Sequence, residues 1–218
     1  MDSQLIQIPQ IEQNHVYKVY DEIADEFNDT RYSVWYFVKE FLQDKQNIHG
    51  IDIGCGNGKN MIHEKMVGVD NCEKMLKFAA AKDKPVMKAC CCDLPFIDNT
   101  FDYAMSISVV HHLGTNERRL KAVQEMIRVV KHGNECMFNV WSVEDQERRV
   151  FLPGDNMVTW KSKPTKDKPV GENVYERFYH VYDHALIHSF VSQLYGVHDV
   201  RMFNERGNWV VRMRKNVI

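Results

Sequence analysis

The first part of the chain carries apolar residues at helical spacing. Between Ile11 and Phe27 they recur every three or four positions, and a second run of the same kind starts at Ser33 and reaches Leu42. This spacing places the apolar side chains on one face of a helix. The polar stretch 29–32 interrupts it. The sequence therefore predicts two N-terminal helices, and residues 1–45 are expected to form a helical cap.

From residue 48 onward, short apolar runs alternate with amphipathic segments. Such alternation is typical of a parallel sheet with helices on both faces. Asn71 suits the N-cap of a helix that starts at Cys72. Gly133 lies just beyond the end of a second amphipathic segment, residues 116–130. The predicted strands are Ile48–Ile53, Met66–Asp70, Val86–Cys92, Phe101–Ser108 and Glu135–Trp141, and the predicted helices are Cys72–Ala81 and Asn116–Val130.

The regular alternation stops after Trp141. Residues 142–175 contain prolines, glycines and lysines without a clear period. Long segments of this kind inside a compact domain are usually functional or disordered, so we assign 142–175 to an irregular insertion on the substrate side. A helix at Asp183–Tyr195 and two strands, Val197–Glu205 and Trp209–Lys215, follow. We expect an α/β fold whose seven-stranded, mostly parallel sheet ends in an antiparallel hairpin, in one domain over 1–218.

Composition agrees with one globular domain, because the chain has 218 residues of which 44% are hydrophobic. The net charge of −2 gives no global basic field for nucleic acid, so any such binding must use a local patch. No apolar run approaches the roughly 20 residues of a membrane span, and the N-terminus lacks the basic and apolar regions of a signal peptide. We expect a cytoplasmic protein, with the nucleus as an alternative, and no membrane partner.

The six cysteines do not form the paired Cys-x-x-Cys pattern of a zinc site. Three of them are consecutive, Cys90, Cys91 and Cys92, in a run with strand character. We interpret these three as small apolar residues in a reducing compartment. The sequence therefore predicts no bound metal.

The most informative motif is the segment Ile51–Gly58, in which Asp52 precedes the glycines 54, 56 and 58. Glycines let the backbone turn sharply and let a ligand approach it closely. The spacing lacks the final glycine of the dinucleotide fingerprint, which favours S-adenosylmethionine over NAD. Asp70 ends the second strand and can accept both hydroxyls of a ribose. Asp93, after the third strand, is a candidate for the adenine amino group.

The acidic strand ends are expected to converge, because ligands in such sheets bind outside the carboxyl ends of the strands. Loop-capping carboxylates are the alternative reading. The fourth strand runs into His111 and His112, which are candidates for substrate contact or simply polar residues at a helix start. The candidate cofactor residues are Tyr20, Asp52, Gly54, Gly56, Asp70, Asp93, Leu94, Ser106 and Val109.

Several segments together resemble the eukaryotic tRNA wobble-uridine carboxyl methyltransferases. The resemblance covers nearly the whole chain, and Arg177–His180 and Asn208-Trp209 are its discriminating parts. One departure is that Phe151–Gly154 fits the family's Val-Pro-Trp stretch only loosely. The matching segments are Tyr20–Ala24, Thr30–Tyr32, Ile51–Gly58, Asn99–Asp102, Ser106–Leu113, Glu117–Arg119, Val140-Trp141, Glu176–His180 and Gly207–Val211.

The resemblance implies a class I methyltransferase that uses S-adenosylmethionine to esterify the carboxylate of 5-carboxymethyluridine in the tRNA anticodon loop. A carboxylate is already ionised at neutral pH, so the reaction needs alignment rather than a general base. An arginine fork matches a carboxylate; Arg31 and Arg177 are the candidates, although Arg31 could hold the carboxylate of the cofactor instead. The candidate catalytic residues are Arg31, His112, Trp141, Arg177 and His180.

Trp141 is a candidate for stacking on the wobble base, with a core tryptophan as the alternative. Lys161–Lys168 and Arg148-Arg149 are candidates for phosphate contacts, or merely solvated loop residues. A small-molecule methyltransferase of the same fold is the alternative function.

The resemblance also implies a heterodimer with a small zinc-binding activator subunit. We expect the activator at the edge strand 86–92, where Lys88 is the one charged residue. Shielding of that edge by a loop or by the N-terminal helices is the alternative.

Overall fold

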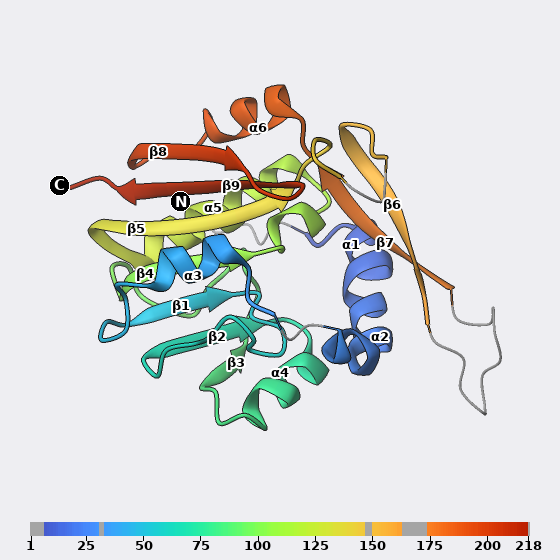
Figure 1. Cartoon of the computed structure of the whole chain (residues 1–218), viewed down its shortest axis with the longest axis horizontal. Helices are drawn as coiled ribbons and strands as arrows, with labels where there is room; N and C mark the ends of the chain where they lie inside the picture. Colours follow the sequence, from blue (N-terminus) through green and yellow to red (C-terminus); the bar gives the residue numbers. More distant parts are fainter. Residues whose placement is uncertain (1–6, 31–32, 147–149, 163–173, 218) are drawn as a thin grey trace.

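The computed structural model describes residues 7–30, 33–146, 150–162 and 174–217. Its centre is a seven-stranded sheet of order β3-β2-β1-β4-β5-β9-β8 (Figure 1). The first five strands in that order are parallel, and β9 runs antiparallel to both of its neighbours. The predicted α/β fold is therefore confirmed. The strands are β1 (Gly50–Ile53), β2 (Met66–Asp70), β3 (Val86–Lys88), β4 (Phe101–Ile107), β5 (Val130–Trp141), β8 (Val197–Asn204) and β9 (Asn208–Lys215).

Both faces of the sheet are buried, because successive side chains of a strand point to opposite sides. On β4, Tyr103 packs in one apolar cluster with Phe41, and Ala104 packs in the other with Val123. The first cluster contains α3 (Tyr36–Leu42) and part of α4 (Glu73–Ala80), and the second contains α5 (Asn116–Val129) and α6 (His184–Val191). The described residues contain no helix long and apolar enough to cross a membrane.

The N-terminal helix is a continuous rod made of α1 (Gln10–Glu12), the π-helical turn η1 (Gln13–Tyr17) and α2 (Lys18–Asp29). A buried ion pair fixes it to α5, since Glu12 Oε1 lies 2.7 Å from Arg118 Nε. The same oxygen accepts a 2.7 Å hydrogen bond from the amide of Gly114. Both charged side chains are almost fully buried, so removing one would leave the other uncompensated. The rod is thereby held beside the carboxyl ends of the strands.

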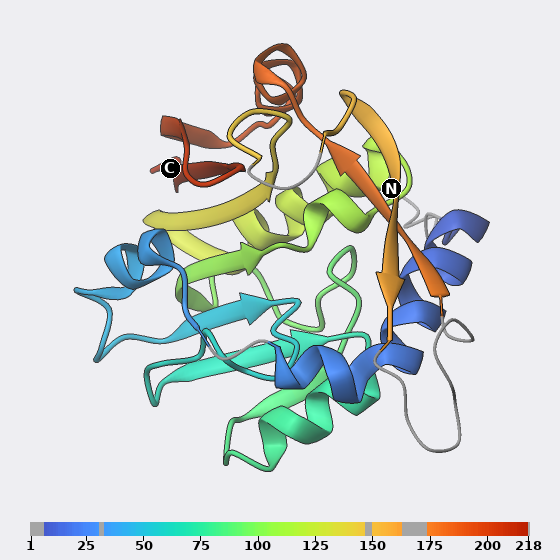
Figure 2. The same ribbon diagram turned by 45° about the vertical axis from the view of Figure 1, so that its right-hand side comes forward.

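The segment 142–175 contains regular structure where we predicted an irregular insertion. β6 (Gly154–Lys161) pairs antiparallel with β7 (Val174–Val181) in a separate two-stranded sheet. This hairpin lies alongside the N-terminal rod (Figure 2). Covered and exposed positions do alternate along β6, but Gly154 and Asn156 are on the covered face and Met157 is on the exposed face. The prediction was wrong because the sequence therefore lacks the apolar alternation of a half-buried strand.

Three further predictions are corrected at element boundaries. β3 ends at Lys88 rather than at residue 92, because an antiparallel bridge between Cys90 and Asp93 turns the chain. α4 begins at Glu73, and Asn71 does not cap it; the carboxylate of Asp70 accepts from the amide of Cys72 instead. β5 starts at Val130, directly after α5, and continues through residue 133.

Candidate active site

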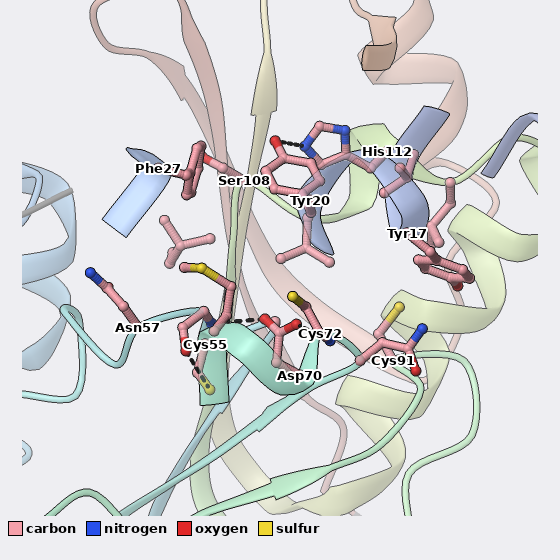
Figure 3. A pocket seen from close by; sticks show the side chains of 18 of the residues that line it. Tyr17, Tyr20, Phe27, Cys55, Asn57, Asp70, Cys72, Cys91, Ser108 and His112 are labelled. Carbon is pink, nitrogen blue, oxygen red and sulfur yellow. Dashed lines mark hydrogen bonds between the residues drawn. The ribbon is translucent and has the colours of Figure 1, made fainter. Parts of the chain in front are cut away.

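A cavity of about 600 Å³ opens at the carboxyl ends of β1, β2 and β4. The glycine loop after β1, Asp70 and the start of α4 form one side of it. The rod residues Tyr17 and Tyr20, the turn η2 (Val110–His112) and Tyr179 of β7 form the other. Figure 3 shows Asp70 and Cys72 facing Tyr20 and His112 across this space. Its volume lies within the range of small-molecule and cofactor sites.

The backbone of the glycine loop disfavours side chains at two positions, by close contact at Gly54 and by a positive φ at both. Gly54 has φ 78°, and a Cβ there would lie 2.2 Å from Cγ2 of Val109. Gly56 has φ 54°, and its amide donates a 2.8 Å hydrogen bond to Asp70 Oδ2. The other oxygen of Asp70 accepts from the amide of Cys72 at 2.9 Å. Two backbone donors therefore hold the Asp70 carboxylate at the cavity wall, where it can accept hydroxyl groups of a ligand.

Asp52 is fully buried in β1, and neither of its carboxylate oxygens has a hydrogen-bond partner among the described residues. Burial, together with the nearby charge of Asp70, raises the pKa of Asp52 to about 7. An unpartnered buried carboxylate is unusual in a folded protein. The carboxylate of Asp70 and the glycine cradle at one end of the cavity, with Asp52 buried behind them, fit S-adenosylmethionine, which carries a ribose diol and a net positive charge near its methionine end.

The opposite side of the cavity is aromatic. His112 Nδ1 lies 2.8 Å from the carbonyl oxygen of Phe178, to which it must donate, so Nε2 accepts from the hydroxyl of Tyr20 at 2.9 Å. Burial and the nearby positive charge of Arg177 lower the pKa of His112, against the effect of its bond to Phe178, to about 3. His112 is neutral at physiological pH, and its two nitrogens are both engaged in fixing Tyr20.

His111 has the opposite tautomer. Its Nδ1 accepts from the backbone amide of Trp141 at 3.1 Å, so the proton is on Nε2. That nitrogen is buried and has no acceptor within the part of the chain that the structure describes. Burial, followed by the charges of His112 and Arg177, holds the pKa of His111 well below its usual range. His111 therefore offers a neutral hydrogen-bond donor beside the cavity.

Arg177 is 2% exposed and lies between two aromatic rings. Its Cζ is 5.0 Å from the ring centre of Trp160 and 5.3 Å from that of Tyr179. Nε and Nη1 are buried without acceptors among the described residues, as is Nε1 of Trp160. Arg177 and Tyr179 share one face of β7, because they are two positions apart. The guanidinium is thus a buried positive group with two donors that have no acceptor among the described residues.

The structure brings together some of the predicted residues and separates others. Asp52 and Arg177 lie behind the cavity wall. Ser106 is buried and donates to the carbonyl of Ile53, and Leu94 is also buried. Asp93 is exposed. His180 is on the face of β7 opposite to Arg177 and Tyr179, and its Nδ1 lies 2.6 Å from Asp155 Oδ1. Those that line the cavity are Tyr20, Gly54, Gly56, Asp70, Val109, His112 and Trp141. Arg31, Arg148, Arg149 and the lysines from 163 to 168 lie outside the described residues.

Some contributors were missed by the sequence reasoning. Tyr179 stacks on Trp141 with ring centres 4.0 Å apart, and its position depends on the hairpin that was not predicted. Ser108 lines the cavity in a left-handed conformation with φ 61°. Asn139 accepts from the amide of Ser108 and donates to Asn208. The motif Asn208-Trp209 was the sequence signal for this network. Asn208 on β9 holds Asn139 on β5, which in turn holds the left-handed Ser108 at the end of β4.

Comparisons with known proteins agree with this geometry. Residues 51–138 match the family described as "Methyltransferase domain". The chain is 35% identical to the fission yeast protein named tRNA (carboxymethyluridine(34)-5-O)-methyltransferase, over 94% of this chain and 98% of that one. It is 29% identical to the Xenopus tropicalis protein of the same name, alkbh8, over 94% of this chain and 41% of the longer relative.

The fold also resembles a solved structure that contains two proteins. A putative methyltransferase from Haloferax volcanii, in complex with the Trm112 methyltransferase activator, superimposes with a TM-score of 0.63. The match covers 93% of this chain and 98% of that one at 16% identity, so it supports the fold alone.

Proposed function

The chain belongs to the family of the tRNA (carboxymethyluridine(34)-5-O)-methyltransferases, and we propose that it esterifies the carboxylate of 5-carboxymethyluridine in tRNA. The proposed methyl donor is S-adenosylmethionine and the proposed product is the methyl ester. The activity requires one site for a cation-bearing cofactor and an adjoining site for an anionic group. The carboxylates of Asp70 and Asp52 lie at and behind one side of the cavity, and donors without acceptors among the described residues lie at and behind the other, which suits this pair of ligands.

The observation that carries the proposal is the buried guanidinium of Arg177. Arg177 is 2% exposed, and two of its nitrogens lack acceptors among the described residues, so its positive charge is buried without a hydrogen-bonded carboxylate in those ranges. Such a charge is costly unless it is paired. The carboxylate of the substrate would supply the missing partner with fork geometry. Trp160 and Tyr179 hold the plane of the guanidinium, so it is oriented before the substrate arrives.

The mechanism needs no general base. The substrate carboxylate is ionised at neutral pH, and both histidines at the cavity are neutral because of burial. The one free lone pair of neutral His112, on Nε2, accepts from the hydroxyl of Tyr20, while Nδ1 donates to Phe178, so His112 has no lone pair for a substrate proton. The chain instead supplies alignment, which can lower a barrier by roughly 7–11 kcal/mol. Arg177 would fix the carboxylate, and His111 Nε2–H would donate to a further oxygen of the substrate.

The cofactor supplies an electrophilic methyl group on a positively charged sulfur. Asp70 would accept the ribose hydroxyls, because its carboxylate is already held by the amides of Gly56 and Cys72. Asp52 would face the positively charged methionine end and be ionised by it. Tyr20, fixed by His112, would separate the methionine end from the substrate side.

The base itself would meet an aromatic wall. Trp141, Tyr179 and His111 lie within ring-contact distance of one another. Bases of single-stranded RNA loops are commonly recognised by stacking on such side chains. A wobble uridine turned out of the anticodon loop could therefore enter the cavity from the side of the β6–β7 hairpin, with the loop phosphates near Lys161.

The proposed activator subunit would bind at β3. This strand is at the edge of the sheet, and Met87 there is 40% exposed. An edge strand offers unpaired backbone groups to another chain. Substitution of Met87 by glutamate should reduce co-purification with the activator, whereas Tyr195→Glu, an exposed residue beyond α6, should not. Cys91 is unsuitable for this test, because it lines the cofactor cavity rather than the outer edge.

The proposed function is tested by methyl transfer. The chain, co-expressed with the activator, is incubated with labelled S-adenosylmethionine and tRNA that carries 5-carboxymethyluridine. Nucleoside analysis should find the methyl ester at the wobble position and none in the same tRNA with unmodified uridine. Methylation of a small carboxylic acid, without transfer to either tRNA, would instead identify a small-molecule methyltransferase.

A further inference from the structure

We propose that Cys90, Cys91 and Cys92 form a binding site for one soft, thiophilic metal cation in the wall of the cofactor cavity. The sulfur atoms of these three residues lie within 4.8 Å of one another. All three are free thiols. The proposal is independent of the methyl acceptor, and it replaces our interpretation of this run as ordinary apolar strand residues.

The backbone explains why three consecutive thiols meet. In a regular strand, the middle side chain would point away from its two neighbours. Here the strand has already ended at Lys88, and the chain turns so that the amide of Asp93 donates to the carbonyl of Cys90 at 3.0 Å. The amide of Cys92 also lies 3.4 Å from the sulfur of Cys90. The turn therefore gathers the three side chains on one side.

The distances suit a metal after a small adjustment. Zinc–sulfur bonds of about 2.3 Å in tetrahedral geometry place the sulfur atoms about 3.8 Å apart. Cys90 and Cys91 are only half-buried, so their side chains can rotate inward, and Cys92 would exchange its contact with the carbonyl of Arg118 for the metal. Each coordinating thiol would release its proton to solvent. No oxidant or reductant is required.

The ligand set selects the class of metal. The described residues supply three sulfur atoms and no fourth histidine, cysteine or carboxylate ligand in the same group. Thiolates favour soft ions such as Cu(I) and ions with high sulfur affinity over Mg²⁺ or Ca²⁺. A three-sulfur site with an open position therefore fits Cd²⁺, Cu(I) or similar ions.

Metal and cofactor should compete. Cys90 and Cys91 line the cavity beside Asp70 and Cys72, and Figure 3 shows Cys91 on the same side as Asp70. A cation bound by these sulfur atoms would draw residues 89–92 toward it. The cation would also occupy part of the cavity where the cofactor binds. Because coupling between two ligands is reciprocal, bound cofactor should weaken metal binding by the same factor.

The test uses the full chain and Cd²⁺ as the probe. Sulfur-to-cadmium charge-transfer absorption and native mass spectrometry should report one Cd²⁺ per chain. The Cys91→Ser variant should bind at least about a hundredfold more weakly, because even loss of an outer-shell partner costs tenfold to hundredfold. The matched control is Cys72→Ser, which removes another half-buried thiol of the same cavity and should bind Cd²⁺ like the unmodified chain.

Cys91 is preferred to Cys92, which is buried against Leu113 and Ala122 and whose loss could unfold the turn. Binding of S-adenosylhomocysteine to the Cys91→Ser variant checks that it is folded. Saturating S-adenosylhomocysteine should also raise the apparent Kd for Cd²⁺ in the unmodified chain. Equal Cd²⁺ affinity in the unmodified chain and in Cys91→Ser would place the metal elsewhere and overturn the proposal. An apparent Kd for Cd²⁺ that S-adenosylhomocysteine does not change would overturn the proposed competition.

Discussion

The cofactor side and the substrate side of the cavity leave unsatisfied groups of opposite kinds. Among the described residues, the unpartnered atoms behind the cofactor side include two acceptors, the carboxylate oxygens of Asp52. Those at and behind the substrate side are donors, the nitrogens of His111, Trp160 and Arg177. A buried polar group is normally paired, so each side is complementary to a ligand of the opposite kind. The difference indicates a cationic ligand on one side and an anionic ligand on the other.

The two sides also differ in how the chain builds them. Gly56 and Asp70 are 14 positions apart and are joined directly by a backbone hydrogen bond. Tyr20 is 92 positions from His112 and 159 from Tyr179, although its hydroxyl contacts both side chains. The cofactor side is a local motif, whereas the substrate side exists only when the rod, η2 and β7 are assembled.

The largest expected effect is on the substrate side. Arg177→Ala should lower kcat/KM for methyl transfer by about a hundredfold to a thousandfold, as removal of a preorganised donor commonly does. Affinity for S-adenosylhomocysteine, measured by calorimetry, should be nearly unchanged. Arg177→Lys keeps the charge and should recover only part of the rate, because the fork is lost. If both variants also lost their affinity for S-adenosylhomocysteine, Arg177 would have a structural role. The proposed separation of a cofactor side from a substrate side would then be wrong.

The reciprocal change on the cofactor side is Asp70→Ala. It removes an acceptor that the amides of Gly56 and Cys72 hold at the cavity. A hydrogen bond to a charged group contributes about 1.5–3 kcal/mol, so affinity for S-adenosylhomocysteine should fall roughly tenfold to hundredfold. Binding of tRNA, measured separately by gel shift, should persist. Unchanged calorimetric affinity would exclude Asp70 from the cofactor site.

Asp52 adds a pH dependence to the cofactor side. Its pKa of about 7 in the folded chain lies above the usual value of about 4. The protonated form therefore stabilises the cofactor-free fold below about pH 4, and this contribution declines as the pH rises to about 7. A cationic cofactor needs the ionised form, so its affinity should fall by up to about tenfold per pH unit below 7. Asp52→Asn should flatten both profiles, and a pH-independent affinity in the unmodified chain would contradict this assignment.

The smallest expected effect concerns His111. His111→Phe keeps an aromatic ring against Trp141 and Tyr179 but removes the Nε2–H donor. A neutral hydrogen bond contributes about 0.5–1.5 kcal/mol, so KM for tRNA should rise roughly threefold to tenfold at unchanged cofactor affinity. A much larger fall in kcat with unchanged KM would show that His111 acts in the reaction step itself.

The sequence predicted the cofactor side better than the substrate side for a physical reason. The glycine spacing and Asp70 are adjacent in the chain and obey local backbone rules, so they could be recognised from the residues alone. β6 could not, because Asn156 is on its covered face and Met157 on its exposed face, which removes the apolar alternation of a half-buried strand. Without that hairpin, the contact of Tyr179 with Trp141 and the burial of Arg177 could not be derived. The turn at residues 90–93 leaves the side chain of Asp93 exposed and outside the cavity lining, so its contact with the adenine amino group stays a prediction.

The measurement that tests the account most directly compares two tRNAs that differ in one charge at the wobble base. One carries 5-carboxymethyluridine and the other the neutral 5-carbamoylmethyluridine, which has no carboxylate to esterify. Binding to the unmodified chain, saturated with S-adenosylhomocysteine, should be at least about tenfold tighter for the carboxylate, the value expected for a hydrogen bond to a charged group. In Arg177→Ala the two tRNAs should bind equally. Equal binding by the unmodified chain would contradict the claim that its substrate side is built for an anion.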